Sequence, residues 1–434
     1  MNGAPVNFIC MFSGDIMNYR EARSCINSIS GRGISMGTER IRLLLERLGN
    51  PQKQLKAVHA AGTNGKGSTL ALSESVLRHA GFKTGIYLSP AVCEYRETIC
   101  CGGGMITEEE FADAFSCVWK AADGLSDRPT VFEMETATAF LHFCRKGCEI
   151  VFIEAGMGGR DDATNVFDGA LCNVITRIGL DHTRFLGGTA GEIAENKAEI
   201  IKQNGSVVLG IQDERFSDEV FAAVKKKADE TGSEIIFARD FLETASGYKT
   251  GLAGQFQRMN AAAALGVIDV LKKKGYPAGD EDIRSGFAAA SLPARFETIH
   301  LNPRIIIDGA HNAGAAEQLA AEVMKHFTNE PIVFIMGVFS DKEYEKIAQI
   351  TVPLADAVIT LTPKSERALD AEKLAECVKR YTRNAGTASG VCDALDKACS
   401  MLKFLRAKAK GDGVIIAFGS FSFLGELKRA VKDL

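Results

Sequence analysis

Short apolar runs recur along the chain, and each is followed by a glycine-bearing loop and then by a segment with helical spacing. In the first two thirds the runs are LKAVHAA (55–61), EIVFIEA (149–155) and LCNVITRI (171–178). Runs of this length that alternate with helical segments predict a mostly parallel sheet with helices on both faces. Ligands of such sheets bind beyond the carboxyl ends of the strands, so the loops after these runs are the first candidates for a site.

The same pattern restarts after residue 295. The strands predicted there are 304–307, 331–336, 357–361 and 414–418. We therefore predict an α/β protein with a large N-terminal domain over residues 1–297 and a smaller C-terminal α/β domain over residues 298–434.

Composition and charge narrow the class of protein. Of the 434 residues, 46% are hydrophobic and 24% are charged, and the formal net charge is −4. This balance favours neither nucleic acid nor an anionic membrane as partner, and no apolar run approaches the ~18 residues of a membrane span. The first twenty residues lack the basic and apolar regions of a signal peptide. We expect a cytoplasmic protein.

The twelve cysteines do not suggest a disulfide framework. They include no Cys-x-x-Cys pair and no set with the spacing of a zinc site. Cys144 and Cys148 lie four residues apart in an apolar helical pattern, where cysteine serves as a small hydrophobe. We expect reduced, structural thiols.

The first loop, AGTNGKGS (61–68), resembles a phosphate-binding loop. It departs from G-x-x-x-x-G-K-[ST], because its glycines are two residues closer and an extra glycine follows the lysine. A glycine-rich turn between strand and helix directs backbone N–H groups and the helix dipole at one point. Lys66 adds a full positive charge, and Ser68 offers a hydroxyl to Mg²⁺. The alternative is a glycine-rich turn without a ligand.

Two further strand ends carry polar candidates. Glu154 follows an apolar run and could hold Mg²⁺ across from the phosphate loop, or could cap a loop amide. His182, in GLDHT, is either a site residue whose ring Asp181 orients or a structural histidine.

Lys197 stands out because it lies among apolar residues. The segment TAGE (189–192) is typical of a capping box that starts a helix, and Gly205 indicates the end of that helix. By the i, i+3, i+4 rule Lys197 shares the inward face with Ile193, Ile200 and Ile201. A buried ammonium is costly, so this side chain either shifts its pKa, finds a partner, or extends to solvent.

The C-terminal part offers its own candidates. Asp308 and His311 lie in DGAHN, between a predicted strand and helix, and Ser420 lies in a similar junction. These residues could face the first domain across a cleft, or they could serve the turns alone.

Together, these segments resemble the folylpolyglutamate synthase and dihydrofolate synthase family, within the Mur-ligase-like ATP-dependent amide ligases. The matching segments follow the family order along almost the whole chain. They are GTERIRLLLERLGNPQ (37–52), AAGTNGKGST (60–69), YLSP (87–90), FIEAGMGGRDDATNV (152–166), ITRIGLDHT (175–183), ENKAEII (195–201), Gln257 with Asn260, PARFE (293–297), DGAHN (308–312) and GSFSFLGE (419–426).

The resemblance implies a Mur-ligase-like fold, with a large P-loop ATPase-type domain and a smaller Rossmann-like domain. It also implies an ATP-dependent, carbon–nitrogen bond-forming ligase. ATP phosphorylates a folate-type carboxylate, and the amine of L-glutamate attacks the acyl phosphate, with release of ADP and phosphate. A carboxylate is a poor electrophile, and phosphorylation supplies a leaving group. The implied cofactors are ATP, two Mg²⁺ ions and a monovalent cation. The implied partners are folate or dihydropteroate and L-glutamate, bound by a monomer.

The resemblance also assigns residues. Lys66, Glu154, His182 and Lys197 are the implied catalytic group, and Lys197 matches a lysine that family members carry as a carbamate. The implied nucleotide-binding residues are Gly62, Thr63, Asn64, Gly65, Lys66, Gly67, Ser68, Asn260, Arg295 and Asp308. The implied metal ligands are Ser68, Ser89, Glu154 and His182. The implied substrate contacts are Phe132 and Asp162 at the pterin end and His311 and Ser420 at the glutamate end.

The chain departs from the family pattern on the acceptor side. Ala91 replaces a histidine and Thr98 an arginine, Glu135 adds a charge at a usually apolar position, and Asn196 stands where a glutamate commonly precedes the lysine. The alternatives are a Mur-like ligase for a non-folate acid and a non-catalytic ATP-binding relative.

Overall fold

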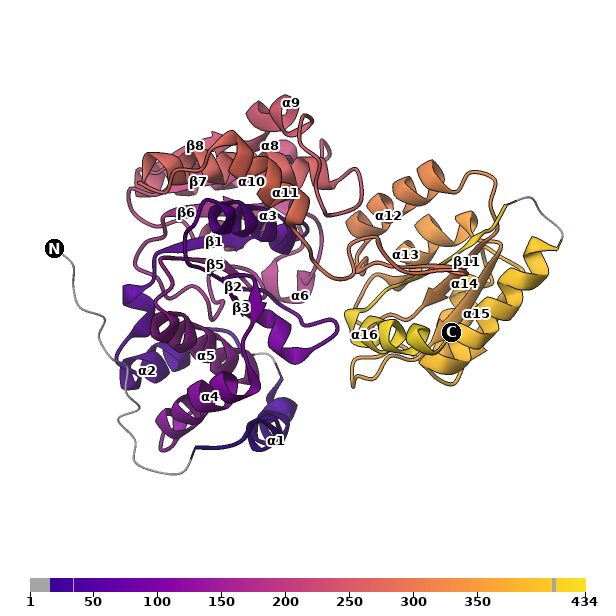
Figure 1. Ribbon diagram of the computed structural model, residues 1–434, viewed down its shortest axis with the longest axis horizontal. Coiled ribbons are helices and arrows are strands. Elements are labelled where there is room, and N and C mark those ends of the chain that lie inside the picture. The colour runs from indigo at the N-terminus through magenta and orange to yellow at the C-terminus, as the bar shows by residue number, and fades with distance from the viewer. Residues whose placement is uncertain (1–15, 34, 408–410) are drawn as a thin grey trace. The chain divides into compact units, whose positions relative to one another are not determined.

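The computed structural model describes residues 16–33, 35–407 and 411–434 (Figure 1). Residues 1–15, on which the expectation about a signal peptide rests, lie outside the described residues, as does Cys10.

The chain divides into two compact units. The first comprises Met1–Pro90, Arg96–Gly251 and Arg258–Ala290, and the second comprises Ala91–Tyr95, Leu252–Gln257 and Ser291–Leu434. The second unit thus includes two short segments from earlier in the chain, for which the sequence carries no local signal. The boundary after residue 297 stays a prediction.

The first unit is built on an eight-stranded sheet with the order β4-β3-β2-β5-β1-β6-β7-β8. Six strands are parallel, and β3 and β4 continue the β2 edge in antiparallel fashion. The strands are β1 (Ala57–Ala61), β2 (Thr84–Tyr87), β3 (Ile99–Cys101), β4 (Gly104–Met105), β5 (Ile150–Glu154), β6 (Cys172–Ile175), β7 (Ser206–Leu209) and β8 (Glu234–Phe237).

Helices cover both faces of this sheet, because its central strands are buried throughout and carry apolar residues on both sides. In Figure 1, α4 and α5 lie on one side, and α3, α10 and α11 lie on the other. The helices are α1 (Tyr19–Ile29), α2 (Glu39–Arg47), α3 (Lys66–His79), α4 (Glu108–Ala122), α5 (Val131–Lys146), α6 (Thr183–Leu186), α7 (Ala190–Ala198), α8 (Ser217–Thr231), α9 (Leu242–Ala245), α10 (Gln257–Lys273) and α11 (Asp280–Ala289).

The second unit has a six-stranded sheet with the order β13-β12-β11-β14-β10-β9, in which only β9 is antiparallel among the described strands. The strands are β9 (Glu297–Leu301), β10 (Arg304–Ile307), β11 (Ile332–Met336), β12 (Ala357–Leu361), β13 (Ala385–Ala388) and β14 (Val414–Phe418). The helices are α12 (Ala313–His326), α13 (Tyr344–Thr351), α14 (Ala371–Val378), α15 (Val391–Arg406) and α16 (Phe421–Ala430).

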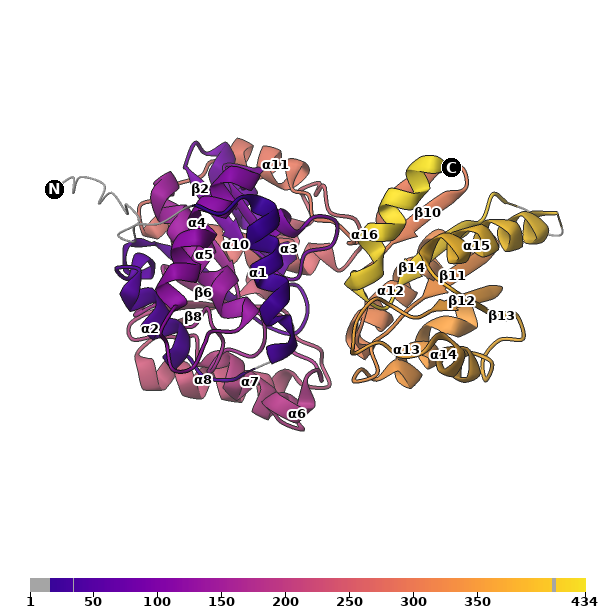
Figure 2. The same ribbon diagram turned by 90° about the horizontal axis from the view of Figure 1, so that it is seen from below.

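Two apolar cores lie on opposite faces of the second sheet, because successive strand residues point to opposite sides. Phe334 and Ile416 pack with residues of α12, α13 and α14. Val333 and Ile415, one residue earlier on the same strands, pack with residues of α15 and α16. The helices separate in the same way in Figure 2.

The predicted α/β architecture and the predicted strands are confirmed, but two local predictions are wrong. The helix that carries Lys197 ends at Ala198 rather than near Gly205. Ile200 and Ile201 are still buried, through a tight turn beyond the helix. Likewise α5 ends before Gly147, which adopts a left-handed conformation, so Cys148 lies outside the helix.

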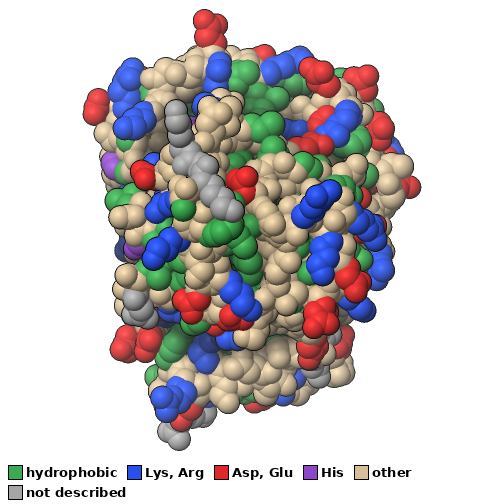
Figure 3. Space-filling view, turned by 90° about the vertical axis from the view of Figure 1, so that its right-hand side faces the viewer, with side chains coloured by type: hydrophobic (Ala, Val, Ile, Leu, Met, Phe, Trp, Pro, Cys, Tyr) green, Lys and Arg blue, Asp and Glu red, His purple; other side chains and the backbone are tan. Residues whose placement is uncertain are grey.

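The surface of Figure 3 mixes charges of both signs, with Lys and Arg side chains interspersed among Asp and Glu. None of the helices within the described ranges has the length and apolar character needed to cross a bilayer.

Candidate active site

The predicted phosphate loop connects β1 to α3, and its glycines are required by close neighbours. Gly65 caps α3 in a left-handed conformation with φ 93°. A Cβ on Gly65 would clash with Oδ1 of Asn260, and one on Gly62 would clash with Oγ1 of Thr176. The structure therefore places Asn260, from α10, against the loop, and its contact with nucleotide stays a prediction.

The start of the loop is tethered to the segment after β6. The backbone N–H groups of Thr63 and Asn64 donate to the Arg177 carbonyl at 2.9 and 3.1 Å. Oγ1 of Thr63 donates to the Gly179 carbonyl at 3.0 Å. Sequence reasoning missed Arg177, whose only signal was its place near the end of the apolar run that precedes GLDHT.

Lys66 lies between a carbonyl and a carboxylate. Its Nζ donates to the Gly62 carbonyl at 3.1 Å and is 3.6 Å from Oε1 of Glu154. The backbone N–H of Ser89, just after β2, donates to the other carboxylate oxygen of Glu154 at 3.3 Å. Glu154 itself is buried at the end of β5. The carboxyl ends of β1, β2 and β5 therefore bring the loop lysine, Glu154 and Ser89 together.

Lys197 points inward, as predicted, and reaches the same carbonyl. The residue is only 4% exposed, and its Nζ donates to the Gly62 carbonyl at 2.9 Å. Burial, together with the nearby positive charge of Lys66, lowers the pKa of Lys197 to about 7, while Asp181, Asp162 and Glu154 oppose this shift. A large fraction of this amine is therefore neutral near physiological pH.

The helix α7 that carries Lys197 is fixed at both ends. The predicted capping box forms at its start, between Thr189 and Glu192. Near its end, the side-chain oxygen of Asn196 accepts from the Gly159 N–H at 3.0 Å. A Cβ on Gly159 would lie 2.6 Å from the Lys197 carbonyl oxygen, so only glycine allows this close approach.

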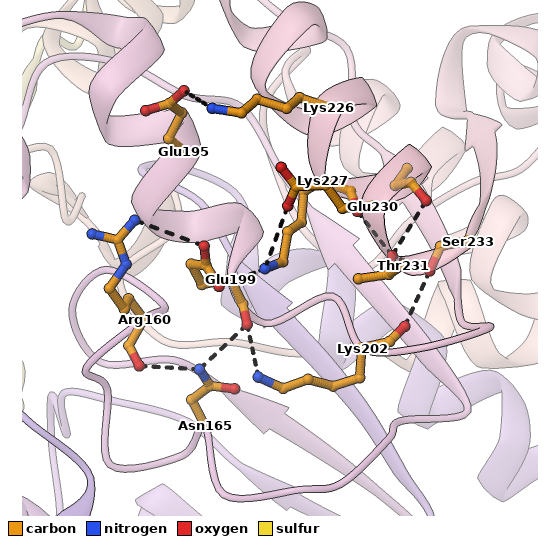
Figure 4. A network of polar contacts seen from close by, with 11 residues as sticks. Arg160, Asn165, Glu195, Glu199, Lys202, Lys226, Lys227, Glu230, Thr231 and Ser233 are labelled. Carbon is orange, nitrogen blue, oxygen red and sulfur yellow. Dashed lines mark hydrogen bonds and ion pairs between the residues drawn. The ribbon is translucent and has the colours of Figure 1, made fainter.

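A polar network follows the last turn of α7 (Figure 4). The Glu199 carboxylate lies 2.7 Å from Nζ of Lys227 on α8 and 3.7 Å from Arg160 in the loop after β5. The Glu199 carbonyl accepts from Nζ of Lys202 at 2.8 Å and from Nδ2 of Asn165 at 3.4 Å. These side chains take the carbonyl that a longer helix would have used, which explains why α7 stops where it does.

His182 adopts a left-handed conformation at the start of α6, with φ 52°. Oδ1 of Asp181 accepts from the His182 backbone N–H at 2.8 Å but is 4.0 Å from the ring Nε2. Asp181 therefore contacts the backbone more closely than the imidazole. Ser68 is buried in the first turn of α3.

The two residues assigned to the pterin end differ in environment. The Phe132 ring stacks on Tyr87 with a centroid distance of 6.0 Å, and it occupies the space where a side chain on Gly156 would project. The buried Asp162 carboxylate accepts from the N–H groups of Met157 and Thr164. Burial raises the pKa of Asp162. These hydrogen bonds order its own loop, and substrate contact by either residue stays a prediction.

In the second unit, the turn after β10 holds a buried carboxylate. The two oxygens of Asp308 accept from the N–H groups of Phe296 and Ala310 at 2.9 and 2.8 Å. Burial raises the pKa of Asp308 to about 6, against the opposing effect of Arg295. The guanidinium of Arg295 lies 5.2 Å from the centroid of the Phe421 ring.

The two residues assigned to glutamate lie in the same unit. Nδ1 of His311 is 2.8 Å from the Gly309 carbonyl oxygen, and its ring is 5.6 Å from that of Phe421. The buried Ser420 caps α16, because its Oγ accepts from the Ser422 N–H. A role for this unit across a cleft from the first stays a prediction.

Within the described part of the chain, no three His, Cys, Asp or Glu side chains are grouped as a metal site would require. A divalent ion at the phosphate loop would therefore need hydroxyl, phosphate or water oxygens besides Glu154 and any histidine.

The chain matches two family models in tandem. Residues 60–268 match the Mur ligase middle domain, and residues 294–421 match the Mur ligase, glutamate ligase domain. The dihydrofolate synthase/folylpolyglutamate synthase of Bacillus subtilis is 30% identical over 440 residues, which cover 95% of this chain and 99% of that protein.

Solved structures show the same fold. The Mycobacterium tuberculosis folylpolyglutamate synthase complexed with ADP has a TM-score of 0.86 at 26% identity and covers 95% of this chain and 98% of that chain. The bifunctional folylpolyglutamate synthase/dihydrofolate synthase of Yersinia pestis, complexed with AMPPNP and Mn ion, has a TM-score of 0.80 at 27% identity, with 96% and 98% covered. The predicted Mur-ligase-like fold is therefore confirmed, and the chain belongs to the folylpolyglutamate synthase and dihydrofolate synthase family.

Proposed function

We propose that the protein is an ATP-dependent ligase that joins L-glutamate to a folate-type carboxylate through an acyl phosphate, with release of ADP and phosphate. One observation carries this proposal beyond family membership. Two lysine side chains and one buried glutamate converge on the phosphate loop, where Lys66 and Lys197 both donate to the Gly62 carbonyl. Lys66 can offset negative charge of a triphosphate brought against the loop, and the buried Lys197 amine beside it is available for modification.

Lys66 binds the phosphates in this proposal. Its present partners, the Gly62 carbonyl and Glu154, hold the ammonium beside the loop N–H groups. An incoming triphosphate offers this ammonium stronger, charged acceptors. The loop residues from Gly62 to Ser68, with Asn260 beside Gly65, complete the first unit's part of the nucleotide site.

Lys197 acts as a carbamate. A neutral amine attacks CO₂ and gives up a proton, so the lowered pKa of Lys197 favours this modification. The carbamate replaces a buried cation by an anion, and Lys66 lies close enough to offset that negative charge. The new group can then position a second cation or the reacting carboxylate near the loop.

A divalent cation fits the residues present at the loop. Glu154 supplies a buried carboxylate, and the hydroxyls of Ser68 and Ser89 and the imidazole of His182 complete the proposed ligand set. The Ser89 backbone N–H donates a hydrogen bond to Glu154 at 3.3 Å. When bound, Mg²⁺ supplies positive charge against the phosphate oxygens. Two such ions and a monovalent cation complete the proposed cofactors.

Residues of both units divide the remaining roles. Arg295 and Asp308 bind nucleotide, and His311 and Ser420 bind the incoming glutamate. Phe132 and Asp162 contact the pterin end of the acceptor. A monomeric state and a cytoplasmic location complete the proposal.

The test is an acceptor panel with the full-length protein, ATP, Mg²⁺, bicarbonate and L-glutamate. Dihydropteroate and tetrahydrofolate are offered separately, and ADP release and glutamylated product are both measured. We expect product with at least one of them. Because Ala91 and Thr98 depart from the family pattern, the panel also includes a non-folate acid, a peptidoglycan precursor, and product with that acid alone would exclude the folate assignment.

The matched control is Lys197→Ala. We expect it to lose turnover with every acceptor and to recover part of it when a short carboxylic acid such as acetate is added. Normal turnover by Lys197→Ala would exclude the carbamate role.

A further inference from the structure

Two cysteines of the first unit lie in contact although they are far apart in sequence. The Sγ atoms of Cys101 and Cys148 are 3.6 Å apart, and 47 positions separate the residues. Cys101 ends β3, and Cys148 follows the left-handed Gly147 that caps α5. Both residues are partly exposed.

The backbone on either side of both thiols is fixed by the start of β2. The N–H of Gly102, next to Cys101, donates to the Thr84 carbonyl at 2.9 Å. The N–H of Glu149, next to Cys148, donates to the Lys83 carbonyl at 2.8 Å. Because the adjacent residues Lys83 and Thr84 anchor both segments, the fold brings the two cysteine backbones side by side.

The surroundings favour a thiolate at one of the two positions. The hydrogen bond between the two sulfur atoms, together with the positive charges of Lys83 and Lys146, lowers the pKa of the Cys148 thiol against the opposing effect of burial. A thiolate is the reactive form in exchange with a disulfide. Cys148 is therefore the attacking group, and Cys101 is placed to resolve the product.

We propose that Cys101 and Cys148 form a reversible oxidation site, at which a low-molecular-weight disulfide converts the two thiols into an intramolecular disulfide. The Cys148 thiolate attacks one sulfur of the small disulfide and expels the other as a thiolate. Cys101 loses its proton and attacks Sγ of Cys148, which expels the second small thiolate. Two protein thiols are oxidised by two electrons, and one small disulfide is reduced to two thiols.

The location of the pair separates this modification from catalysis. Cys101 pairs with Gly85 near the start of β2, and Cys148 lies just before the start of β5. Ser89 and Glu154 follow or end the same two strands at the opposite edge of the sheet. The disulfide therefore links two segments of the first unit at a distance from the phosphate loop. We expect it to stabilise the folded protein without loss of turnover.

The experiment treats the reduced, full-length protein with oxidised glutathione, blocks remaining thiols with N-ethylmaleimide, and maps peptides without reduction. We expect a peptide pair joined through Cys101 and Cys148, a mass lower by about 2 Da before blocking, and reversal by dithiothreitol. The oxidised protein should unfold about 5 °C higher than the reduced protein.

Three variants decide the assignment. Cys101→Ser should leave a glutathione adduct on Cys148, and Cys148→Ser should leave Cys101 unmodified. Cys100→Ser, whose thiol contacts the Glu97 carbonyl instead, should keep the crosslink. Glutathione adducts without a crosslink in the unchanged protein, a crosslink between other cysteines, or an unoxidised pair would overturn the proposal.

Discussion

At the end of β1 two lysine side chains donate to one backbone carbonyl, whereas at the end of β10 one aspartate accepts from two backbone N–H groups. Both places are junctions between a strand and a helix, and both bury charge. The two lysines share an uncharged acceptor, the Gly62 carbonyl, through flexible side chains, and Lys66 also lies 3.6 Å from the Glu154 carboxylate. Asp308 is held by backbone groups that cannot move independently of the fold. The first junction can therefore release its cations to an anion, while the second keeps its carboxylate in place.

The largest expected effect comes from removing the positive charge of Lys66 at the first junction. Lys66→Met should lower kcat/KM for ATP-dependent ligation about 10³-fold, because the phosphates lose a direct positive charge in a partly buried site. Steady-state ADP release measures this loss. The matched control is Lys202→Met, which also removes a lysine that donates to a carbonyl, that of Glu199, and it should change kcat/KM by less than about threefold. Equal losses in the two variants would contradict the assignment.

The fixed carboxylate should appear as a pH dependence of stability. The pKa of Asp308 is raised to about 6, so between about pH 4 and pH 6 the unfolded chain ionises first and the folded state loses stability as pH rises. The difference in free energy of unfolding between Asp308→Ala and the unchanged protein should therefore shift by about 2 kcal/mol in favour of the variant from pH 4 to pH 7, measured by urea unfolding.

The control for that titration is Asp370→Ala. Asp370 also accepts from two backbone N–H groups, those of Glu372 and Lys373, but at an exposed helix start. It should lower stability without the pH-dependent gain. If the free energies of unfolding of Asp308→Ala and of the unchanged protein vary in the same way with pH across this range, Asp308 ionises as an ordinary carboxyl group.

Lys197 allows a sharper test of the first junction. Its pKa of about 7 predicts that ligation falls about tenfold for each pH unit below 7, because only the neutral amine can take up CO₂. Competitive acetylation followed by peptide mapping reports the same titration directly. Surface lysines such as Lys53 in the same digest serve as the internal control, and a Lys197 that reacts in step with them would rule out the lowered pKa.

The smallest expected effect is at the network beyond α7. Glu199→Gln removes half-exposed ion pairs to Lys227 and Arg160, so we expect a loss of about 0.5 kcal/mol in urea unfolding and unchanged turnover. Glu195→Gln, which removes only an exposed pair with Lys226, should cost less. A large loss of turnover in Glu199→Gln would mean that this network positions Lys197.

The sequence predicted some elements of the fold and of the candidate site but not others. The apolar runs located the strands, because a strand that is buried on both faces appears in the sequence as a short continuous apolar run. The inward face of α7 followed from the helical periodicity around Lys197. The end of that helix did not follow, because Asn165 and Lys202 take the Glu199 carbonyl from distant or looped segments. Only tertiary contacts decide such a competition.

The hydrogen bonds that hold the phosphate loop could not be predicted either, because they too are tertiary contacts. Arg177 acts through its backbone carbonyl, which every residue carries, so its identity gave no signal. Cys148 was misplaced because its spacing from Cys144 matched a helix that Gly147 ends. The inward position of Lys197 followed from helical periodicity, whereas contacts made through a backbone carbonyl or between distant segments did not follow from any local pattern.

The doubly occupied carbonyl of Gly62 has a consequence for nucleotide affinity. The Gly62 carbonyl competes with a triphosphate for the Lys66 ammonium. A triphosphate can bind Lys66 only in the fraction of molecules in which that ammonium has left the Gly62 carbonyl and Glu154. The apparent dissociation constant equals the intrinsic constant divided by this fraction. A hydrogen bond from a charged group contributes about 1.5 kcal/mol or more, so the resting contacts weaken apparent binding about tenfold. Ligands with several phosphate oxygens can offset this loss, whereas a single weak anion cannot, so the loop discriminates against simple anions.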